Sequence, residues 1–297
     1  MANTEQASSP FQPGETAEVT DRQLVGAAVS GDQKALESLI DRHHPWIYNL
    51  AFRMVMVPQD AEDVTQEVLV KILTKLGAYD PAKGAFRTWL YRIVVNHVLN
   101  MKSRGYEDAI TGFDTYYSFV EQVPDLNPDD TPETALITED LKIGCVMGTL
   151  LCLDRTQRLA FLLTVVFGAT DALGSELMGI SRANFRQTLS RARSRLRQYM
   201  SGNCSLVNPD APCKCRKKVK TFIDSGAYSA DRLNYLVPER PAMAEIVARV
   251  EERYENEIDP RIQDLFRSHP FHSGKDLGPW LDELLGSSQF EDIFNLN

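Results

Sequence analysis

Apolar residues recur at three- and four-residue intervals along most of this chain, and this helical period most constrains its fold. Between residues 60 and 77 the period gathers aliphatic side chains on one face of a predicted helix. That face consists of Ala61, Val64, Val68, Leu69, Ile72, Leu73 and Leu76. Nowhere does the sequence alternate polar and apolar residues over the length of a half-buried strand. The sequence therefore predicts an all-α fold.

A second long amphipathic helix is predicted over residues 85–104, after the turn-forming sequence YDPAKG. Its apolar positions are Phe86, Trp89, Leu90, Ile93, Val94, His97, Val98 and Met101. Its outer face carries Arg87, Arg92, Asn96, Asn100, Lys102 and Arg104. Upstream, the pattern predicts that a new helix follows Pro45 and that Asp60 caps the next one.

Further along the chain, helices are predicted at about 135–151 and 154–167. A short helix at 170–178 then stops at Gly179, and Ser181 is a suitable N-cap for the helix that follows. A helix, a glycine-containing turn and a capped helix make a helix-turn-helix layout.

Charge is unevenly distributed along the chain. Although the formal net charge is −9, residues 181–198 contain six arginines and no acid. Residues 180–220 hold 11 basic residues against one acid, whereas residues 106–140 hold 10 acids and no Lys or Arg. Residues 221–297 hold 15 acids and 7 basic residues. Two acidic segments therefore flank a basic one, and this alternation needs a physical reason.

The basic helix after Ser181 has an apolar stripe that runs from Phe185 to Tyr199. The polar side chains left for solvent or a partner are Arg182, Arg186, Gln187, Ser190, Arg191, Arg193 and Arg197. Arginine suits phosphate oxygens and guanine edges, and glutamine suits adenine. Like charges at i,i+4 spacing destabilise such a helix in isolation. The pattern favours a nucleic-acid-binding helix over a solvated basic helix or a coiled-coil flank.

At 297 residues the chain is long enough for about two domains. The N-terminal sequence lacks the basic and apolar parts of a signal peptide, and the apolar run from Leu159 to Ala169 is too short to cross a bilayer. Five cysteines are too sparse for a disulfide framework. We therefore expect a cytoplasmic protein without a membrane segment.

Two separated blocks resemble the two domains of bacterial extracytoplasmic-function (ECF) sigma factors of the sigma-70 family. Residues 60–104 are similar to region 2, including the DAEDVTQEV and FRTWLYRIVVN stretches, and GISRANFRQTLSRARSRLRQ is similar to the region 4 recognition helix. The implied organisation is a disordered N-terminus (1–19), region 2 (20–105), an acidic linker (106–134), region 4 (135–200) and a Cys-containing C-terminal extension (201–297).

The resemblance also implies partners. The helix at 60–77 is expected to dock on the β′ clamp helices of core RNA polymerase, and region 4 is expected to meet the β flap. The residues implied for the clamp contact are Glu62, Asp63, Gln66 and Glu67. A sigma factor of this kind directs the polymerase to promoter DNA and catalyses nothing itself. An anti-sigma factor is a further candidate partner.

By the same resemblance, the helix at 85–104 is expected to read the opened −10 element. Backbone contacts are expected from Arg87, Arg92, Lys102 and Arg104, and base contacts from Asn96 and Asn100. Contacts to the −35 element are expected from Arg182, Arg186, Gln187, Ser190 and Arg191. Tyr79, in the loop where the family captures a flipped base, is a candidate either for stacking on a base or for covering the core.

The sequence departs from the family pattern just before the recognition helix. Gly174 and Ser175 stand at positions where the family usually has an apolar residue and an alanine. Because glycine inside a helix costs about 1 kcal/mol relative to alanine, the packing of the two helices is in question there.

The C-terminal extension contains three cysteines close to basic residues: Cys204, Cys213 and Cys215. They are incidental reduced cysteines, redox-sensing thiols whose pKa the basic neighbours lower, or a zinc or copper(I) site completed by His269 or His272. Cys145 and Cys152 lie on an apolar helical stretch and are expected in the core.

The acidic end of the extension is expected to fold back on the basic surfaces and to regulate the protein in cis. A tail that strengthens polymerase binding is the competing interpretation. For the whole chain, the alternative is a helix-turn-helix DNA-binding regulator that never joins RNA polymerase. A thiol or metal enzyme centred on Cys213 and Cys215 is disfavoured, because the sequence has no C-x-x-C, no histidine paired with a cysteine and no Gly-rich cofactor loop.

Overall fold

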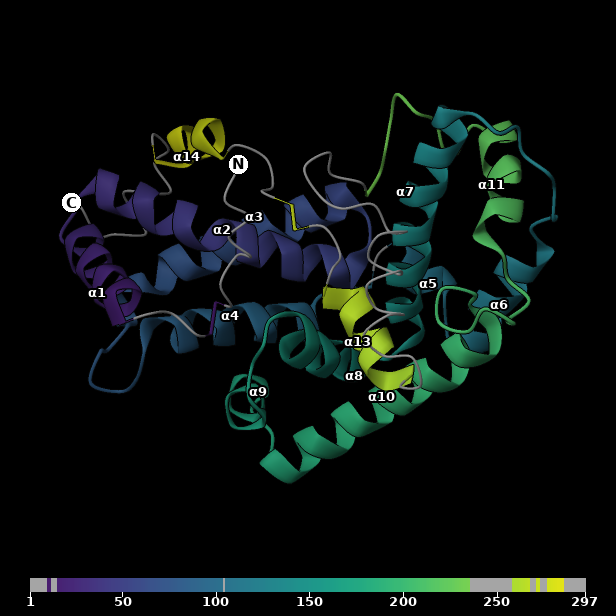
Figure 1. Ribbon diagram of the computed structural model, residues 1–297. Helices are drawn as coiled ribbons and strands as arrows, with labels where there is room; N and C mark the ends of the chain where they lie inside the picture. The colour runs from purple at the N-terminus through teal and green to yellow at the C-terminus, as the bar shows by residue number, and fades with distance from the viewer. Residues whose placement is uncertain are drawn as a thin grey trace. The chain divides into compact units, whose positions relative to one another are not determined.

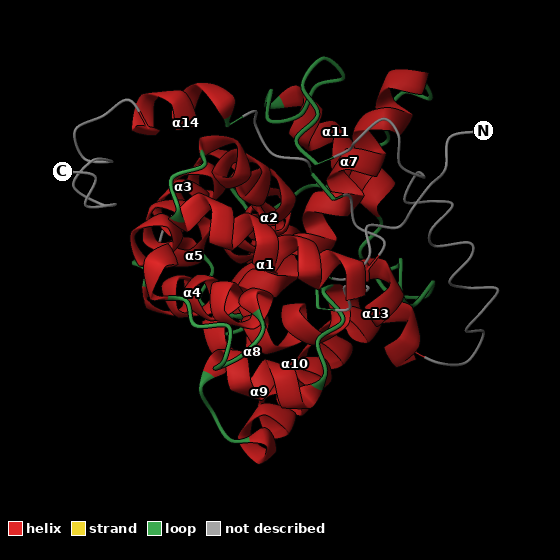
Figure 2. Ribbon diagram, turned by 90° about the vertical axis from the view of Figure 1, so that its left-hand side faces the viewer, coloured by secondary structure: helices red, strands yellow, loops and turns green. Residues whose placement is uncertain are grey.

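The computed structural model describes residues 10–11, 15–103, 105–235, 258–267, 271–272 and 277–285. Within these ranges the regular elements are all helices, apart from two isolated bridges, so the all-α prediction is confirmed (Figure 2). The helices are α1 (Glu15–Val29), α2 (Gln33–Val55), α3 (Pro58–Lys75), α4 (Phe86–Asn100), α5 (Tyr106–Ala109), α6 (Phe113–Gln122), α7 (Pro132–Gly148), α8 (Arg155–Phe161), α9 (Asp171–Met178), α10 (Arg182–Asn203), α11 (Cys215–Asp224), α13 (Ile258–Arg267) and α14 (Gly278–Leu285) (Figure 1). No helix within the described ranges is long and apolar enough to span a membrane.

The chain divides into two compact units. Unit 1 comprises Met1–Lys102, Phe167–Phe185 and His272–Asn297, and unit 2 comprises Ser103–Val166 and Arg186–Phe271. Unit 1 therefore holds α1 to α4, α9 and α14, whereas α5 to α8, α11 and α13 belong to unit 2. Helix α10 begins in unit 1 and continues into unit 2.

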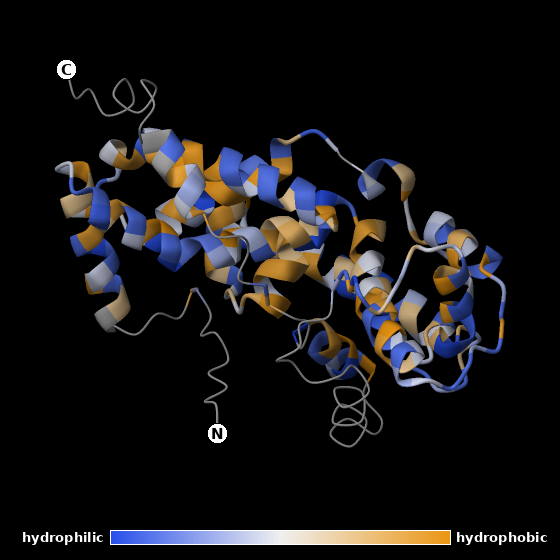
Figure 3. Cartoon of the chain, turned by 90° about the horizontal axis from the view of Figure 1, so that it is seen from above, coloured by the Kyte–Doolittle hydropathy of each residue, from blue (hydrophilic) through white to orange (hydrophobic). Residues whose placement is uncertain are grey.

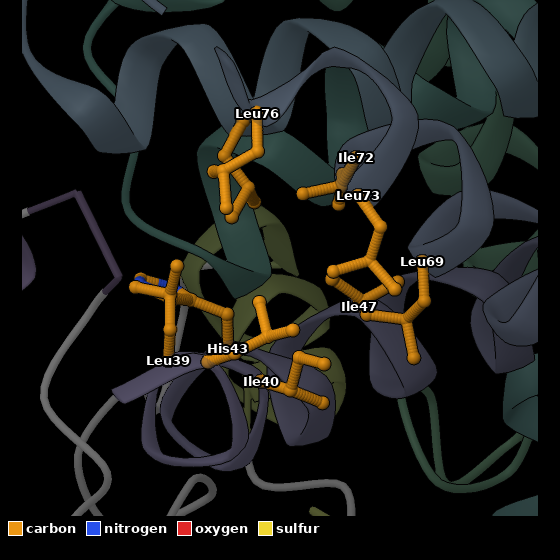
Figure 4. Close-up of a pocket in the computed structure, with 10 residues that line it drawn as sticks. Leu39, Ile40, His43, Ile47, Leu69, Ile72, Leu73 and Leu76 are labelled. Carbon is orange, nitrogen blue, oxygen red and sulfur yellow. The ribbon is translucent and has the colours of Figure 1, made fainter. Parts of the chain in front are cut away.

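The core of unit 1 lies between α2 and α3. All seven apolar residues predicted on one face of the 60–77 helix are buried. Four of them, Leu69, Ile72, Leu73 and Leu76, line a cavity of about 10 Å³ together with α2 residues that include Leu39, Ile40 and Ile47 (Figure 4). A cavity of that size holds at most one water molecule, so this region is packing rather than a ligand site. Figure 3 shows the same alternation of hydrophobic and hydrophilic positions along the helices.

Two predicted helix boundaries in unit 1 are wrong. Helix α2 continues through Pro45, where the sequence predicted a new helix. Proline removes the hydrogen bond to the carbonyl of Asp41, but Asp41 is exposed, so water can take that place. Helix α3 begins at Pro58 rather than after a cap at Asp60, because a proline at the first helical position gives up an N–H that has no helical partner there.

A buried ion cluster fastens α1 to the rest of unit 1. The Asp21 side chain has no exposed surface, and Arg42 Nε and Arg87 Nε lie 2.8 Å and 2.7 Å from its two oxygens. His43 Nε2 lies 3.5 Å from Oδ1. Burial alone would raise the pKa of Asp21, but the hydrogen bonds and charges of His43, Arg87 and Arg42 hold it well below its usual range. Burial lowers the pKa of His43, despite the neighbouring carboxylate.

Helices α9 and α10 have the predicted helix-turn-helix layout. Gly179 adopts a left-handed conformation with φ of 64° and closes α9. Ser181 Oγ accepts a hydrogen bond from the backbone N–H of Asn184 at 3.2 Å, which caps α10. A Cβ atom at Gly174 would lie 2.3 Å from Cζ of Phe185. The glycine that departs from the family pattern is therefore what allows the buried Phe185 ring to lie directly on the α9 backbone.

In unit 2, the first part of the C-terminal extension is an integral layer of the fold. Helix α11 packs on α7 through a small apolar cluster formed by Ile137, Leu141 and Val219. The buried carboxylate of Asp140 accepts hydrogen bonds from the backbone N–H groups of Asn234, at 2.9 Å, and Tyr235, at 2.7 Å. Residues 201–235 therefore fold together with α7.

The segment predicted as an acidic linker, 106–134, contains α5 and α6. Both carboxylate oxygens of Glu107 are paired, with Arg155 Nη2 at 2.6 Å and with Arg158 Nη1 at 2.8 Å. The hydroxyl of Tyr116 donates a hydrogen bond to the Cys145 carbonyl at 2.8 Å. These contacts hold α5 against α8 and α6 against α7. At the other end of the chain, α1 begins at Glu15, inside the 1–19 stretch expected to be disordered, and residues 1–9 and 12–14 lie outside the described residues.

Candidate functional site

The four acidic and amide side chains predicted for polymerase contact lie on the outer side of α3. Asp63 and Glu67 are exposed, and Glu62 and Gln66 are half-buried. Their i, i+1, i+4 and i+5 spacing places them together on the face opposite the packed core. Glu67 Oε2 lies 3.3 Å from His97 Nε2 of α4, which orients that carboxylate. The result is an acidic surface on the solvent side of unit 1.

Three of the polar residues predicted for the −10 contact form a row along α4. Arg92, Asn96 and Asn100 are all exposed, four residues apart, and Lys102 is exposed just beyond the helix. Arg92 pairs with Glu176 of α9 at 3.3 Å, but the two side chains are 52% and 54% exposed. Because exposed ion pairs contribute little to the stability of a fold, Arg92 can exchange its contact with Glu176 for a contact with a phosphate. Arg104, also predicted for this surface, lies outside the described residues.

Arg87 does not lie on that outer face. Its side chain is 14% exposed, and its guanidinium is paired with the buried Asp21 and also donates to the Pro10 carbonyl at 3.0 Å. The sequence placed Arg87 outside because the helical period distinguishes faces but does not reveal a buried carboxylate that lies 66 residues away. Its role is to hold α1 onto α4.

Tyr79 covers the core. Its hydroxyl donates to the Gly84 carbonyl at 3.0 Å, and its ring meets Phe86 at 5.3 Å and Trp89 at 5.6 Å. Trp89 is only half-buried, whereas Tyr91, which the helical pattern left out of the core, is buried. The loop from Tyr79 to Gly84 is therefore braced by an aromatic cluster.

The residues predicted for the −35 contact share the exposed side of α10. Arg182, Arg186, Gln187, Ser190 and Arg191 are all exposed. Arg182 Nη2 lies 2.6 Å from Asp171 Oδ1 at the start of α9, which holds the first arginine in place. The opposite side of the helix is buried along Phe185, Leu189 and Ala192. This arrangement presents guanidinium and amide groups at the N-terminal end of a second helix, where they can meet phosphates and base edges.

Three arginines of the basic stretch remain, and two of them, Arg193 and Arg197, lie beside the extension. Arg197 forms an ion pair with Asp259 of α13, within unit 2. Arg193 is half-buried, and its pKa is lowered by burial and by the charge of Arg267 in α13. The extension therefore meets the C-terminal half of α10.

The cysteines of the extension lie together in unit 2. The backbones of Cys204 and Cys213 form an isolated β-bridge, and both thiols are free. Both residues line one small cavity together with Cys215. Burial raises the pKa of Cys204 to about 12 and that of Cys213 to about 11, so the basic neighbours do not produce the low pKa expected for redox-sensing thiols. Among the described residues, no three Cys, His, Asp or Glu side chains already stand at distances that would hold a metal ion.

Of the two histidines proposed as further ligands, His272 has other partners. His272 belongs to unit 1, where its backbone N–H donates to Asn49 Oδ1 at 3.0 Å and its ring meets Phe52 at 5.1 Å. His269 lies outside the described residues. The sequence instead missed Cys145, which lines the same cavity from α7. Because its sequence neighbours are apolar, Cys145 was predicted to be an ordinary core residue. Cys152, which was predicted in the same way, is buried.

Comparison with known proteins identifies the family. The family model of sigma-70 region 2 matches residues 39–105. The ECF RNA polymerase sigma factor SigE of Mycolicibacterium smegmatis is 30% identical over 213 residues, which make up 69% of this chain and 77% of that protein. The chain belongs to the ECF sigma factors of the sigma-70 family.

Other relatives of this sigma factor cover a similar share of it. SigM of Mycobacterium tuberculosis is 26% identical over 62% of this chain and 86% of that protein. CnrH of Cupriavidus metallidurans is 27% identical over 60% of this chain and 93% of that protein. A solved structure of CnrH in complex with the cytosolic domain of CnrY is 22% identical, with a TM-score of 0.43, and covers 61% of this chain and 97% of that one.

Proposed function

We propose that this sigma factor binds core RNA polymerase, recognises the −10 and −35 elements of a promoter and assists strand opening. The observation that carries the proposal is the exposed set of basic and amide side chains at the start of α10, in the second helix of a helix-turn-helix. A buried position for these arginines would have argued against it. The role is that of a binding protein, in which contact energy directs the polymerase.

Polymerase binding is assigned to the outer side of α3. Its exposed carboxylates, Asp63 and Glu67, stand on a helix whose other face is fixed by the packed core, so they form a rigid docking surface. The β′ clamp helices are the proposed partner of this face, and the β flap is the proposed partner of region 4.

Promoter recognition is assigned to two helices. On α4, Arg92 and Lys102 are suited to backbone phosphates of the opened −10 strand, and Asn96 and Asn100 are suited to its bases. On α10, the −35 duplex is assigned to five exposed residues: Arg182, Arg186, Gln187, Ser190 and Arg191. Arg87 is left out of the proposed contact, because its guanidinium is committed to Asp21.

Reconstitution with core RNA polymerase tests the assignment of α3. We expect the full chain to co-purify with core enzyme and to support run-off transcription from selected promoter DNA. Asp63→Lys and Glu67→Lys should weaken polymerase binding, since each reverses a charge on the docking face. Asp41→Lys is the matched control, because Asp41 is an exposed acid on α2 and should leave binding unchanged. Equal binding by all three variants would reject the α3 surface.

Promoter affinity tests the assignment of α10. Gln187→Ala should cost about 1–3 kcal/mol at one −35 position and relax sequence preference there. Arg191→Ala should weaken binding to all sequences alike and reduce the salt dependence by about one counterion. Gln198→Ala is the control, because Gln198 is an exposed residue further along the same helix. An effect of Gln198→Ala as large as that of Gln187→Ala would remove the proposed contact.

The same reconstitution decides between this function and its alternative. A helix-turn-helix regulator that never joins polymerase would bind duplex DNA through α10 but would neither co-purify with core enzyme nor respond to charge reversal on α3. Specific DNA binding without co-purification would therefore favour the alternative.

We also propose that the extension regulates the protein in cis. Two contacts support this proposal. In unit 1, the His272 backbone N–H is bound by the buried Asn49 of α2, and in unit 2, α13 packs through Phe266 against Phe161 of α8 at 5.1 Å. The extension thus contacts α2, which packs against the proposed polymerase-binding helix α3, in unit 1, and α8 in unit 2.

Truncation after residue 271 tests regulation in cis. It removes the segment docked on α2 but keeps residues 201–235, which the fold of unit 2 requires. If the extension represses, the truncated chain should give more promoter-dependent transcript per bound polymerase than the full chain. Lower output would favour a tail that strengthens polymerase binding. Unchanged output would leave repression to a separate anti-sigma factor.

A further inference from the structure

Four thiols from two distant parts of the chain converge on one cavity in unit 2. The cavity has a volume of about 20 Å³ and is lined by Cys145, Cys204, Cys213 and Cys215, together with apolar residues such as Val146 and Met200. Cys145 comes from α7, Cys204 and Cys213 lie in the segment that joins α10 to α11, and Cys215 is the first residue of α11. The space is large enough for one small ion but not for an organic ligand.

The backbone explains how three thiols of the extension reach the same place. Lys214 is extended, with φ of −111° and ψ of 108°, so Cys213 and Cys215 on either side of it project in the same direction. The Lys214 side chain is directed elsewhere and donates to the Pro209 carbonyl. The isolated β-bridge between the backbones of Cys204 and Cys213 places those two residues side by side. The Cys213 N–H donates to the Asn203 carbonyl at 3.2 Å. A single intervening residue is therefore compatible with two ligands here.

The fourth thiol is fixed by the helix that supports the extension. Cys145 lies one turn beyond Leu141, which belongs to the apolar cluster that holds α11 on α7. The hydroxyl of Tyr116 donates to the Cys145 carbonyl at 2.8 Å and stands 3.4 Å from its sulfur. This packing holds Cys145 in place on the α7 side of the cavity.

Groups around the cavity are suited to negatively charged sulfur. Three lysines act electrostatically on Cys213 or Cys215: Lys142, Lys214 and Lys218. Nearby cations of this kind stabilise thiolates, and thiolates are the form in which cysteine binds a metal.

We propose that Cys145, Cys204, Cys213 and Cys215 together bind one Zn²⁺ ion. Four thiolates are a closed tetrahedral set of the kind used in structural zinc sites. On binding, each thiol releases one proton to solvent and donates a sulfur electron pair to the ion. No electron is gained or lost, so no oxidant is needed. The resulting site has a formal charge of −2 and stands near three lysines, two of which also pair with carboxylates, Lys142 with Glu139 and Lys218 with Asp125.

Ligation requires the thiols to turn inward, since no three of them stand at metal-binding distances within the part of the chain that the structure describes. Rotation about the Cα–Cβ bond is the least costly movement available to a cysteine, which has a single side-chain torsion. The ion would join α7 to the extension and would replace a cavity by four bonds. It would make residues 201–235 dependent on metal for their full stability.

Metal analysis of the full chain, purified without added metal or chelator, is the first test. We expect about one equivalent of zinc per chain, detected by native mass spectrometry and by elemental analysis. The four thiols should resist alkylation until a chelator removes the ion. Replacement by Co²⁺ should give the intense thiolate-to-cobalt absorption of a tetrahedral site. A chain without metal that takes up no Zn²⁺ would overturn the proposal, as would a Cys204–Cys213 disulfide or copper in place of zinc.

Substitutions identify the ligands. Cys145→Ser and Cys213→Ser should each weaken zinc binding by about 100-fold or more, a fall larger than loss of a supporting contact produces. Cys152→Ala is the matched control: Cys152 is a buried cysteine on the adjoining turn, does not line the cavity, and should leave one zinc bound. If a ligand variant fails to fold, stepwise alkylation of the unaltered chain during chelation still reports which thiols the ion protects. Full zinc occupancy in Cys145→Ser would show that α7 does not contribute.

Discussion

The ring of Phe185 occupies the space that any side chain at position 174 would need. Gly174→Ala would place a methyl group 2.3 Å from a ring that has no exposed surface and little room to move. We expect the free energy of unfolding of unit 1 to fall by about 1–3 kcal/mol, the usual cost of overpacking a core. Promoter affinity should fall with it, although no exposed residue of α10 is altered. Thermal unfolding and DNA titration measure the two effects.

Gly202→Ala is the control for that experiment. Gly202 also lies in a helix, but nothing stands within 4 Å of the position that its Cβ would take. The substitution should be neutral or stabilising by up to about 1 kcal/mol, because alanine is the better helix former. If both glycine variants behave alike, the close contact with Phe185 does not matter.

A second prediction about a single residue concerns Asp21. Asp21→Asn keeps the shape but removes the charge that faces Arg42 and Arg87 in a buried cluster. Breaking such a pair leaves uncompensated charge, and we expect a loss of about 3 kcal/mol in the free energy of unfolding of unit 1. Denaturant titration measures this loss. Asp41→Asn, at an exposed position of the same region, should change it by no more than about 0.5 kcal/mol.

What the sequence predicts about single residues depends on the range of the interaction. The inner face of α3 was predicted in full, because burial of that face repeats every three or four residues. Arg87 was misplaced and Asp21 was not singled out, because their contact joins residues 66 positions apart. Cys145 was assigned to the core for the same reason: its neighbours in sequence are apolar, whereas the thiols it meets lie far along the chain.

At the scale of elements, α11 is a structural support of α7. Truncation after residue 200 would uncover Ile137 and Leu141, and would remove the backbone N–H groups that satisfy Asp140. We expect unit 2 to lose at least about 3 kcal/mol in the free energy of unfolding, since each large apolar side chain returned to water costs about 1.5–3 kcal/mol. Truncation after residue 271 should leave unit 2 at its full stability. Chemical denaturation followed by circular dichroism compares the two.

The elements that sequence patterns missed are those that depend on tertiary contacts. The 106–134 segment has no clear helical period, yet α6 forms there because the Tyr116 side chain fits against Gly148, where a Cβ would lie 2.8 Å from its hydroxyl. The sequence predicted a break at Pro45 from its local effect, whereas buried residues on both sides keep α2 continuous. The helix-turn-helix was predictable, because Gly179 and Ser181 mark its turn by local chemistry.

At the scale of the whole molecule, unit 1 should be the more sensitive of the two units to acid. In unit 1 the folded-state pKa values of Asp21 and His43 are lowered, so the unfolded chain binds more protons in acid. Stability of unit 1 should therefore fall as the pH drops below about 6.5, where unfolded histidine titrates, and further below about 4, where unfolded aspartate does.

At alkaline pH both units should lose stability, because burial raises the pKa of tyrosines in each, in unit 1 that of Tyr48 to about 12. In unit 2, burial, with the charges of Tyr106 and Asp140, raises the pKa of Tyr235 to about 12, and burial also raises the pKa of Tyr228. Because the folded state holds these protons longer, stability of both units should fall as the pH rises above about 10. Thermal unfolding, followed separately in each unit across the pH range, measures the loss of stability at acid and at alkaline pH. Equal sensitivity of the two units to acid would contradict the assignment.

The partnership between α7 and residues 201–235 has a practical consequence for building chimeric sigma factors. A graft that ends with the last base-reading side chain of α10 would transplant the specificity but leave behind the layer that steadies α7. A transplantable cassette therefore has to include α5 and α6 as well as the residues up to Tyr235, and a recipient that receives less would inherit a destabilised domain.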